Sequence, residues 1–157
     1  AVGIPAYQGF QQKAKYNAAK TNFSNAKSFI MAEISKCNGL TTPLTFTASD
    51  GTTEPSLACP IDLSPNAQAE GTTYFRQLLW DKFKNPYSTA AGSILDATDL
   101  DSAAASAGVV SSPGVVTEQG YMSLTDSGSG LILTTNIGNQ DGGTTYEVLS
   151  ETMSLTD

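Results

Sequence analysis

The first 36 residues constrain the fold of this chain more than any other stretch, because they have the pattern of one long amphipathic helix. Apolar side chains recur at helical spacing, and the pattern predicts a helix from about Pro5 to Lys36. Proline is tolerated in the first turn of a helix, and Asn38-Gly39 supplies a stop signal. The remainder of the chain is therefore expected to cover one face of this helix.

The apolar residues of the helix fall on two stripes that are offset by more than a quarter turn. The first stripe holds Tyr7, Phe10, Ala14 and Ala18. The second stripe holds Tyr16, Ala19, Phe23, Ala26, Ile30 and Ile34. A surface helix of a single domain keeps one stripe, so two stripes indicate two partners. We expect the second stripe to pack on this chain's own sheet and the first to meet another molecule; the alternative is that Tyr7 and Phe10 lie on a frayed, exposed end.

Downstream of the helix, the patterns predict an α+β fold in a single domain of 157 residues. The long helix forms residues 1–36, and a globular head continuous with it forms residues 37–157. Strand signals separated by Gly-rich turns predict an antiparallel meander laid on the long helix. The expected elements of the head are a short strand at 44–48, a second helix over 72–84 capped by Thr72 or Thr73, and strands at 115–124, 131–137 and 144–149.

Charge is distributed unevenly along the chain. Residues 1–36 hold five lysines and one acidic residue, whereas residues 85–157 hold nine acidic residues and no lysine or arginine. Nucleic acids and anionic lipids bind through basic side chains, so this acidic body argues against a nucleic-acid partner. The split is explained either by a solvated acidic surface or by contact between the basic helix of one copy and the acidic body of the next.

The two cysteines, Cys37 and Cys59, are separated by 21 residues. A metal site needs more ligands, and the chain has no histidine to supply them. A Cys37–Cys59 disulfide is the favoured interpretation for an exported chain. A pair of buried free thiols is the alternative.

No pattern in the chain predicts catalysis or a cofactor. Without histidine, the usual catalytic triads and most general-base schemes are excluded, and no phosphate-binding loop is present. Asp96, Asp99 and Asp101 form the one carboxylate cluster, which is either a solvated loop or a calcium site. Asn22 begins a glycosylation sequon but lies in the middle of the predicted helix. We therefore expect a protein that is not an enzyme.

The run Gly3-Ile4-Pro5-Ala6-Tyr7, followed by the lysine-dotted helix, closely resembles the lower part of the N-terminal helix of type IV pilins. The order of long helix, irregular connection and meander also matches a pilin head. The resemblance implies a structural subunit of an extracellular type IV pilus on the bacterial surface, and it leaves open whether the filament serves adhesion, motility, DNA uptake or secretion. It further implies an apolar half-helix of roughly 20 residues upstream of Ala1, which would hold the subunit in the inner membrane before assembly.

The partners implied by this resemblance are other copies of the chain in a helical filament and the pilus assembly machinery. The predicted assembly interface consists of Tyr7, Phe10 and Ala14, with Lys13 and Lys15 facing the acidic body of a neighbouring copy. The cysteines depart from the common pilin pattern, because many pilins close a disulfide loop near the C-terminus.

Two other functions are retained as alternatives. Residues 80–87 are similar to the Trp-Gly-Asn-Pro-Tyr region of type II secretion major pseudopilins, which bind calcium in a later loop. A secreted carbohydrate- or protein-binding module is the other alternative, with the Thr-rich sheet as its binding face.

Overall fold

The computed structural model describes residues 3–47, 56–62, 65–87, 110–112, 115–116 and 119–155 of the chain. Within these residues, two helices and antiparallel β-sheet make an α+β fold, which confirms the predicted fold class. The elements in chain order are α1 (Gly3–Asn38), α2 (Pro65–Lys82), β1 (Val110–Ser112), β2 (Val115–Val116), β3 (Met122–Asp126), β4 (Gly130–Gly138) and β5 (Glu147–Ser154). A long helix packed on a three-stranded antiparallel sheet is compatible with a pilin-like fold.

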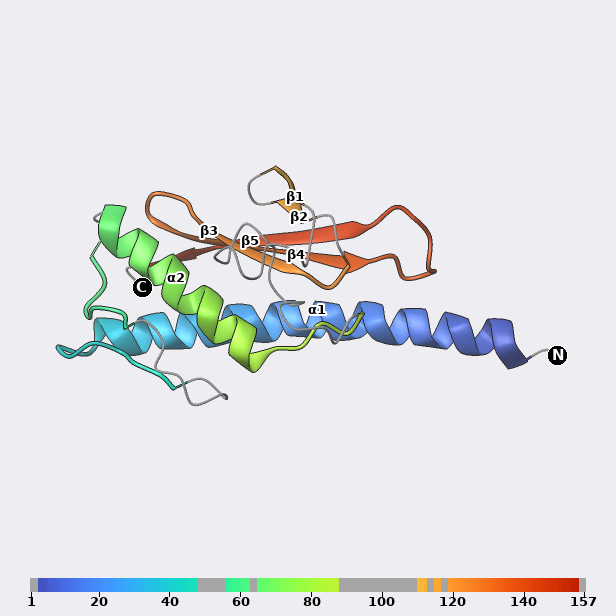
Figure 1. Cartoon of the computed structure of the whole chain (residues 1–157), viewed down its shortest axis with the longest axis horizontal. Coiled ribbons are helices and arrows are strands. Elements are labelled where there is room, and N and C mark those ends of the chain that lie inside the picture. Colours follow the sequence, from blue (N-terminus) through green and yellow to red (C-terminus); the bar gives the residue numbers. More distant parts are fainter. Residues whose placement is uncertain are drawn as a thin grey trace.

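Helix α1 runs along the long axis of the molecule, and its N-terminal turns extend past the sheet (Figure 1). It has 36 residues and is therefore about 54 Å long at 1.5 Å per residue. The second predicted stripe packs inside the molecule, where Tyr16 is half-buried and the later members are buried. The buried side chains of α1 are Ala19, Phe23, Ala26, Ile30, Ile34 and Cys37.

The end of α1 lies at the predicted Asn38-Gly39 signal, but its geometry differs from a left-handed glycine cap. Gly39 does not have a positive φ. The last turn instead tightens into three-residue hydrogen bonds, in which Gly39 N donates to Lys36 O at 3.1 Å and Leu40 N donates to Cys37 O at 3.0 Å. The stop is therefore made by a contracted final turn.

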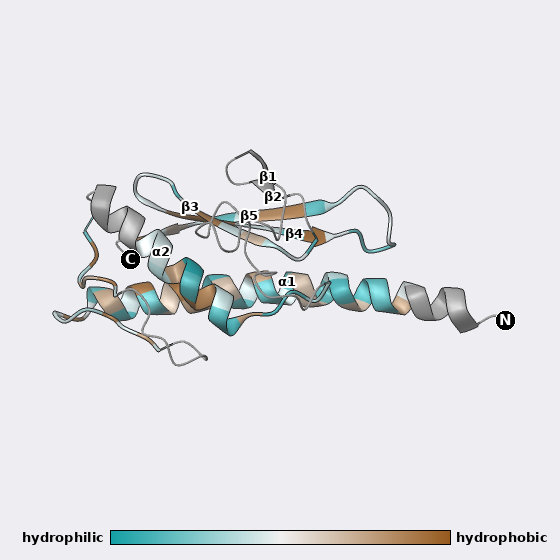
Figure 2. Cartoon of the chain, viewed as in Figure 1, coloured by the Kyte–Doolittle hydropathy of each residue, from teal (hydrophilic) through white to brown (hydrophobic). Residues whose placement is uncertain are grey.

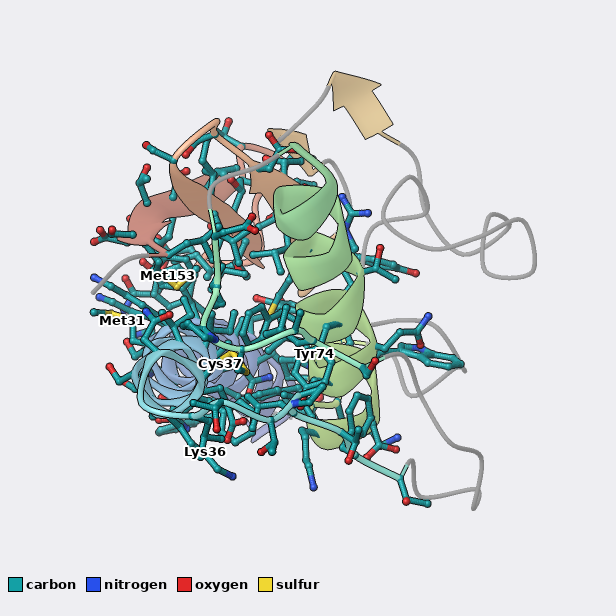
Figure 3. The ribbon with its side chains drawn as sticks, turned by 90° about the vertical axis from the view of Figure 1, so that its left-hand side faces the viewer. Met31, Lys36, Cys37, Tyr74 and Met153 are labelled. Carbon is teal, nitrogen blue, oxygen red and sulfur yellow. A yellow bond between two sulfur atoms is a disulfide. The ribbon has the colours of Figure 1, made fainter. Side chains whose placement is uncertain are left out.

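Helix α2 starts seven residues before the predicted Thr72, at Pro65. The fixed φ of proline suits the first turn of a helix, whereas residues 66–71 offer no large apolar side chain to reveal the helical period. The apolar residues at i,i+4 spacing, Tyr74, Phe75, Leu78 and Leu79, are buried as their spacing predicts. Trp80, which the sequence favoured as a core residue, is 37% exposed instead. Figure 3 shows Tyr74 between α2 and α1, and Cys37 on the inner side of α1.

The sheet has the strand order β3-β4-β5, with both pairs antiparallel. The meander was predicted, but its first strand is split and its last strand is displaced. Residues 115–124 divide into β2 and β3 because Gly120 turns the chain with φ +82°. Strand β5 spans Glu147–Ser154 rather than 144–149. The Asn139 side chain stabilises the turn between β4 and β5. Its Nδ2 donates to Thr145 O at 2.8 Å, and its Oδ1 accepts from Asp141 N at 2.8 Å.

The two faces of the sheet differ in chemistry. The face toward the helices is mainly apolar, and its fully buried apolar residues include Met122, Leu124, Leu131, Leu133 and Met153. Figure 2 shows brown, hydrophobic residues where the sheet and the two helices meet. The outer face is polar, yet Ser123, Thr134 and Asn136 are only 2%, 4% and 1% exposed. Strand β2 lies against β3 and β4.

The segment that follows α2 is anchored to the sheet by two side chains. Asn85 Nδ2 donates to Gln119 O at 3.0 Å, and Asn85 Oδ1 accepts from Tyr87 N at 2.8 Å. The Tyr87 hydroxyl donates to Ile137 O at 2.8 Å. The Asn-Pro-Tyr sequence is thus a clamp between α2 and the turn at Gly120, which gives it a structural role in this fold.

The irregular connection is tied to the end of α1 by the predicted disulfide. Cys37 and Cys59 are bonded, with their Cα atoms 5.0 Å apart. In place of the strand predicted at 44–48, the described residues 44–47 show isolated bridges, among them an antiparallel bridge between Leu44 and Leu57. Asn38 adds two hydrogen bonds, from its Nδ2 to Leu155 O at 3.0 Å and from Ile61 N to its Oδ1 at 3.1 Å. The end of α1, the connection and the end of β5 therefore meet at one point, which we call the hub (Cys37, Asn38, Cys59, Ile61 and Leu155).

Candidate interaction surface

The side of α1 that faces away from the core is the candidate functional surface. At 100° per residue, Phe10 and Ala14 each lie about 160° from the buried Ile30, one on either side of the opposite face. Phe10 is 75% exposed, the most exposed large apolar side chain among the described residues, and Ala14 is exposed as well. The side chain of Tyr7 lies outside the described set. A single exposed apolar side chain is common on protein surfaces, so it is the position of Phe10 and Ala14 on the projecting end of α1 that makes this end a candidate contact.

Beyond Ala14, the same face of α1 carries only small or polar exposed side chains, among them Thr21, Ser28 and Ala32. In Figure 2 the described N-terminal part of α1 is mainly teal, hydrophilic, apart from isolated apolar positions. Small side chains permit close approach of another helix backbone, whereas Phe10 supplies apolar area at one end. This face of α1 is therefore exposed, built of small and polar side chains, and apolar at Phe10.

The two lysines that were grouped in the predicted interface lie on opposite flanks of α1. Lys13 lies on the same flank as Tyr16 and Lys27, which contact β5, and it is exposed. Lys15 is half-exposed and lies on the flank of Asn22, whose Nδ2 donates to Lys84 O at 2.9 Å near the end of α2. One neighbouring copy that docks on a single flank can therefore contact only one of these two lysines. Asn22 itself is engaged in the fold, as expected of a residue in mid-helix.

Strand β5 is attached to α1 by two carboxylates. The Tyr16 hydroxyl donates a hydrogen bond to Glu147 Oε2. Lys27 Nζ lies 3.4 Å from Glu151 Oε2, which makes an ion pair between the middle of α1 and β5. The loop before β5 also reaches the helix, since Gly142 lies against the Gln12 side chain. Gln12 is the most N-terminal of these contact residues. The turns of α1 that precede it extend past the sheet (Figure 1).

The pKa of Tyr16 is raised above its ordinary value of 10.0, chiefly by the hydrogen bond to Glu147 and further by desolvation and by the negative charge of that carboxylate. Because the folded-state pKa is raised, this contact stabilises the fold below the ordinary pKa and is lost as the pH rises through the raised value. We expect Glu147→Gln to return the Tyr16 titration toward the ordinary value. Ring resonances followed by NMR between neutral pH and pH 12 measure this shift.

The matched control is Glu151→Gln, which removes a carboxylate of the same strand that pairs with Lys27 and not with Tyr16. This control should leave the Tyr16 titration where it is in the wild type. An unchanged Tyr16 titration in Glu147→Gln would show that the hydrogen bond does not control the ionisation.

The other predicted chemistry has a limited counterpart in the structure. The Asp96, Asp99 and Asp101 cluster lies outside the described residues. Over the ranges that are described, no group of three His, Cys, Asp or Glu side chains is placed to hold a metal ion. The helices in those ranges are too polar or too short to span a bilayer.

On the outer sheet face, burial of Thr134 and Asn136 leaves these polar groups inaccessible to a soluble ligand, which counts against a broad Thr-rich binding face.

Comparison with known proteins found no relative of this chain. No protein-family model matches it, and neither a curated protein nor a solved structure matches it.

The sequence correctly predicted the exposure of Phe10 and Ala14 and the disulfide, whereas it did not predict the pairing of α1 with β5. Tyr16 and Glu147 are 131 residues apart, and no local pattern joins them. The sequence alone could have predicted the opposite placement of Lys13 and Lys15, because residues two positions apart on a helix are separated by about 200°.

Proposed function

We propose that this chain is a structural subunit of an extracellular type IV pilus filament, which assembles by packing of α1 against α1 of neighbouring copies. The observation that carries the proposal is the 75% exposure of Phe10 on the projecting end of α1, directly opposite the buried stripe. The helix-on-sheet architecture and the small side chains along the same face support it. Under this proposal, the subunit is a non-catalytic protein located in the inner membrane before assembly and in the surface filament afterwards.

The test is Phe10→Asp in the full-length protein expressed in its own cells. Burial of an aromatic side chain contributes about 1.5–3 kcal/mol, and a buried unpaired carboxylate costs more than that gain. We expect loss of filaments with a folded head, measured by electron microscopy of sheared cell surfaces and by circular dichroism of the purified soluble chain. Val148→Asp is the matched control, because Val148 is also an exposed apolar residue, at 43%, but lies on β5.

Normal piliation with Phe10→Asp at wild-type expression would contradict the packing proposal. The pseudopilin alternative would be favoured if wild-type cells had no surface filaments and if Phe10→Asp abolished protein secretion. Secretion of the native protein as a free monomer would favour the binding-module alternative.

The charge contribution can be tested on each flank separately. Lys13→Glu and Lys15→Glu reverse charges on opposite flanks of α1, toward β5 and toward α2 respectively. If the acidic body of a neighbour faces only one flank, one reversal weakens the filament and the other does not. The effect should fade with added salt, since charges separated by more than about 8 Å are screened at physiological ionic strength. Filaments unaffected by both reversals would remove the electrostatic part and leave the apolar part standing.

A further inference from the structure

The Asn38-Gly39 pair at the hub combines a reactive sequence with a protected geometry. An asparagine followed by glycine is prone to deamidation, because glycine has no side chain to hinder attack of its backbone nitrogen on the asparagine amide. In that reaction Gly39 N bonds to Asn38 Cγ, ammonia leaves from Cγ, and a succinimide ring forms. Water then opens the ring to give aspartate or isoaspartate. Each step involves only the chain and water.

Three features of the fold oppose this reaction. First, both polar atoms of the Asn38 amide are occupied, Nδ2 by Leu155 O at 3.0 Å and Oδ1 by Ile61 N at 3.1 Å. Second, the attacking nitrogen, Gly39 N, donates its hydrogen to Lys36 O at 3.1 Å. Third, Asn38 is the last residue of α1 and has helical backbone geometry, which turns the next nitrogen away from its own side chain.

The protection depends on the disulfide through chain connectivity. Cys37 precedes Asn38, and Cys59 lies two residues before Ile61, which supplies the donor to Asn38 Oδ1. The bond between the two cysteines therefore holds the donor of Ile61 beside the amide of Asn38. Opening the disulfide frees the connection, removes this donor and lets the last turn of α1 fray.

We propose that Asn38 is a latent deamidation site, silent in the native fold and activated when the Cys37–Cys59 disulfide is opened by a dithiol. The exchange oxidises the dithiol to its own disulfide and leaves Cys37 and Cys59 as thiols. Deamidation then makes the damage permanent, because a carboxylate oxygen replaces Nδ2 opposite the carbonyl oxygen of Leu155. Two acceptors face each other there, so the end of β5 cannot return to its place on α1.

The experiment follows the ammonia loss at Asn38 by peptide mass spectrometry during incubation at mildly alkaline pH. Three samples are compared: oxidised wild type, wild type kept reduced with dithiothreitol, and wild type unfolded in urea. We expect the oxidised native protein to deamidate at least about tenfold more slowly than the other two, where tenfold corresponds to 1.4 kcal/mol in the free energy of opening. Asn17 and Asn25, each followed by alanine within α1, are internal references.

Gly39→Ala is the matched control variant. A Cβ at this position meets only Lys36 O at 3.6 Å and Ser35 O at 3.8 Å, which are ordinary contacts, so the fold is retained. Reduction of this variant should open the hub as in the wild type yet leave Asn38 largely intact. Circular dichroism of the reduced wild type records whether the hub alone or the whole chain opens. Either result supports the proposal if Asn38 deamidates faster in the reduced than in the oxidised wild type. Equal rates in the oxidised and reduced wild type, or in the oxidised and urea-unfolded protein, would overturn it.

Discussion

Replacing Cys59 with serine is expected to lower the free energy of unfolding by about 2–5 kcal/mol, the usual effect of losing a native disulfide in a small domain. The bridge joins residues 22 apart, and a closed loop of this size corresponds to about 3 kcal/mol in the chain-entropy model. In the folded state the same bridge ties the connection to the end of α1 at the hub. Chemical denaturation followed by circular dichroism measures the change.

The control is reduction of the wild-type protein, which should give the same loss, whereas reductant should not destabilise Cys59→Ser any further. Mass spectrometry without reduction must also find no free thiol in the wild type. Two free thiols per chain in freshly prepared oxidised protein would contradict the disulfide.

Gly120→Ala should produce a loss of similar size by a different mechanism. Gly120 has φ +82°, a conformation that costs an L-residue roughly 1–2 kcal/mol. A Cβ there would also overlap the side chain of Asn85, which is 2% exposed. Displacing Asn85 breaks its bonds to Gln119 O and Tyr87 N, and an unpaired buried group costs about 1–3 kcal/mol. The sum predicts a loss of roughly 2–5 kcal/mol in the free energy of unfolding.

Gly71→Ala is the matched control, because Gly71 lies inside α2 and a Cβ there makes only an ordinary contact, 3.8 Å from Leu57 Cδ1. Alanine in a helix interior is preferred over glycine by about 1 kcal/mol, so this variant should be slightly more stable than the wild type. Equal stabilities for the two alanine variants would show that the clamp at Asn85 does not need the glycine turn.

Local periodicity explains why most of the fold was predictable. The buried stripe through Phe23, Ile30 and Ile34 and the buried positions of α2 follow directly from spacing that a helix imposes. The start of α2 was missed because the sequence of residues 66–71 contains no large apolar residue that would reveal the period. Only the first-turn signal of Pro65 marked it.

The position of β5 was harder to predict, because it is an edge strand of the sheet and buries little apolar surface. Met153 is the one residue of β5 that is fully buried. Its placement is decided by pairing with β4 and by contacts of Glu147 and Glu151 with α1, none of which leaves a local pattern. The exposed face of α1 was predictable because an apolar residue such as Phe10, out of phase with the core stripe, has no partner within the chain.

The contact between α1 and β5 has a consequence for how the chain is made. A ribosome produces α1 first, but the Glu147 that binds Tyr16 is added 131 residues later. At a synthesis rate of about 5–20 residues per second, the part of α1 that β5 contacts stays uncovered for roughly 7–26 seconds. Contacts this distant in sequence also form slowly. The nascent chain, rather than the finished molecule, is therefore the form most exposed to aggregation, and slowing translation before β5 should lower the yield of folded protein.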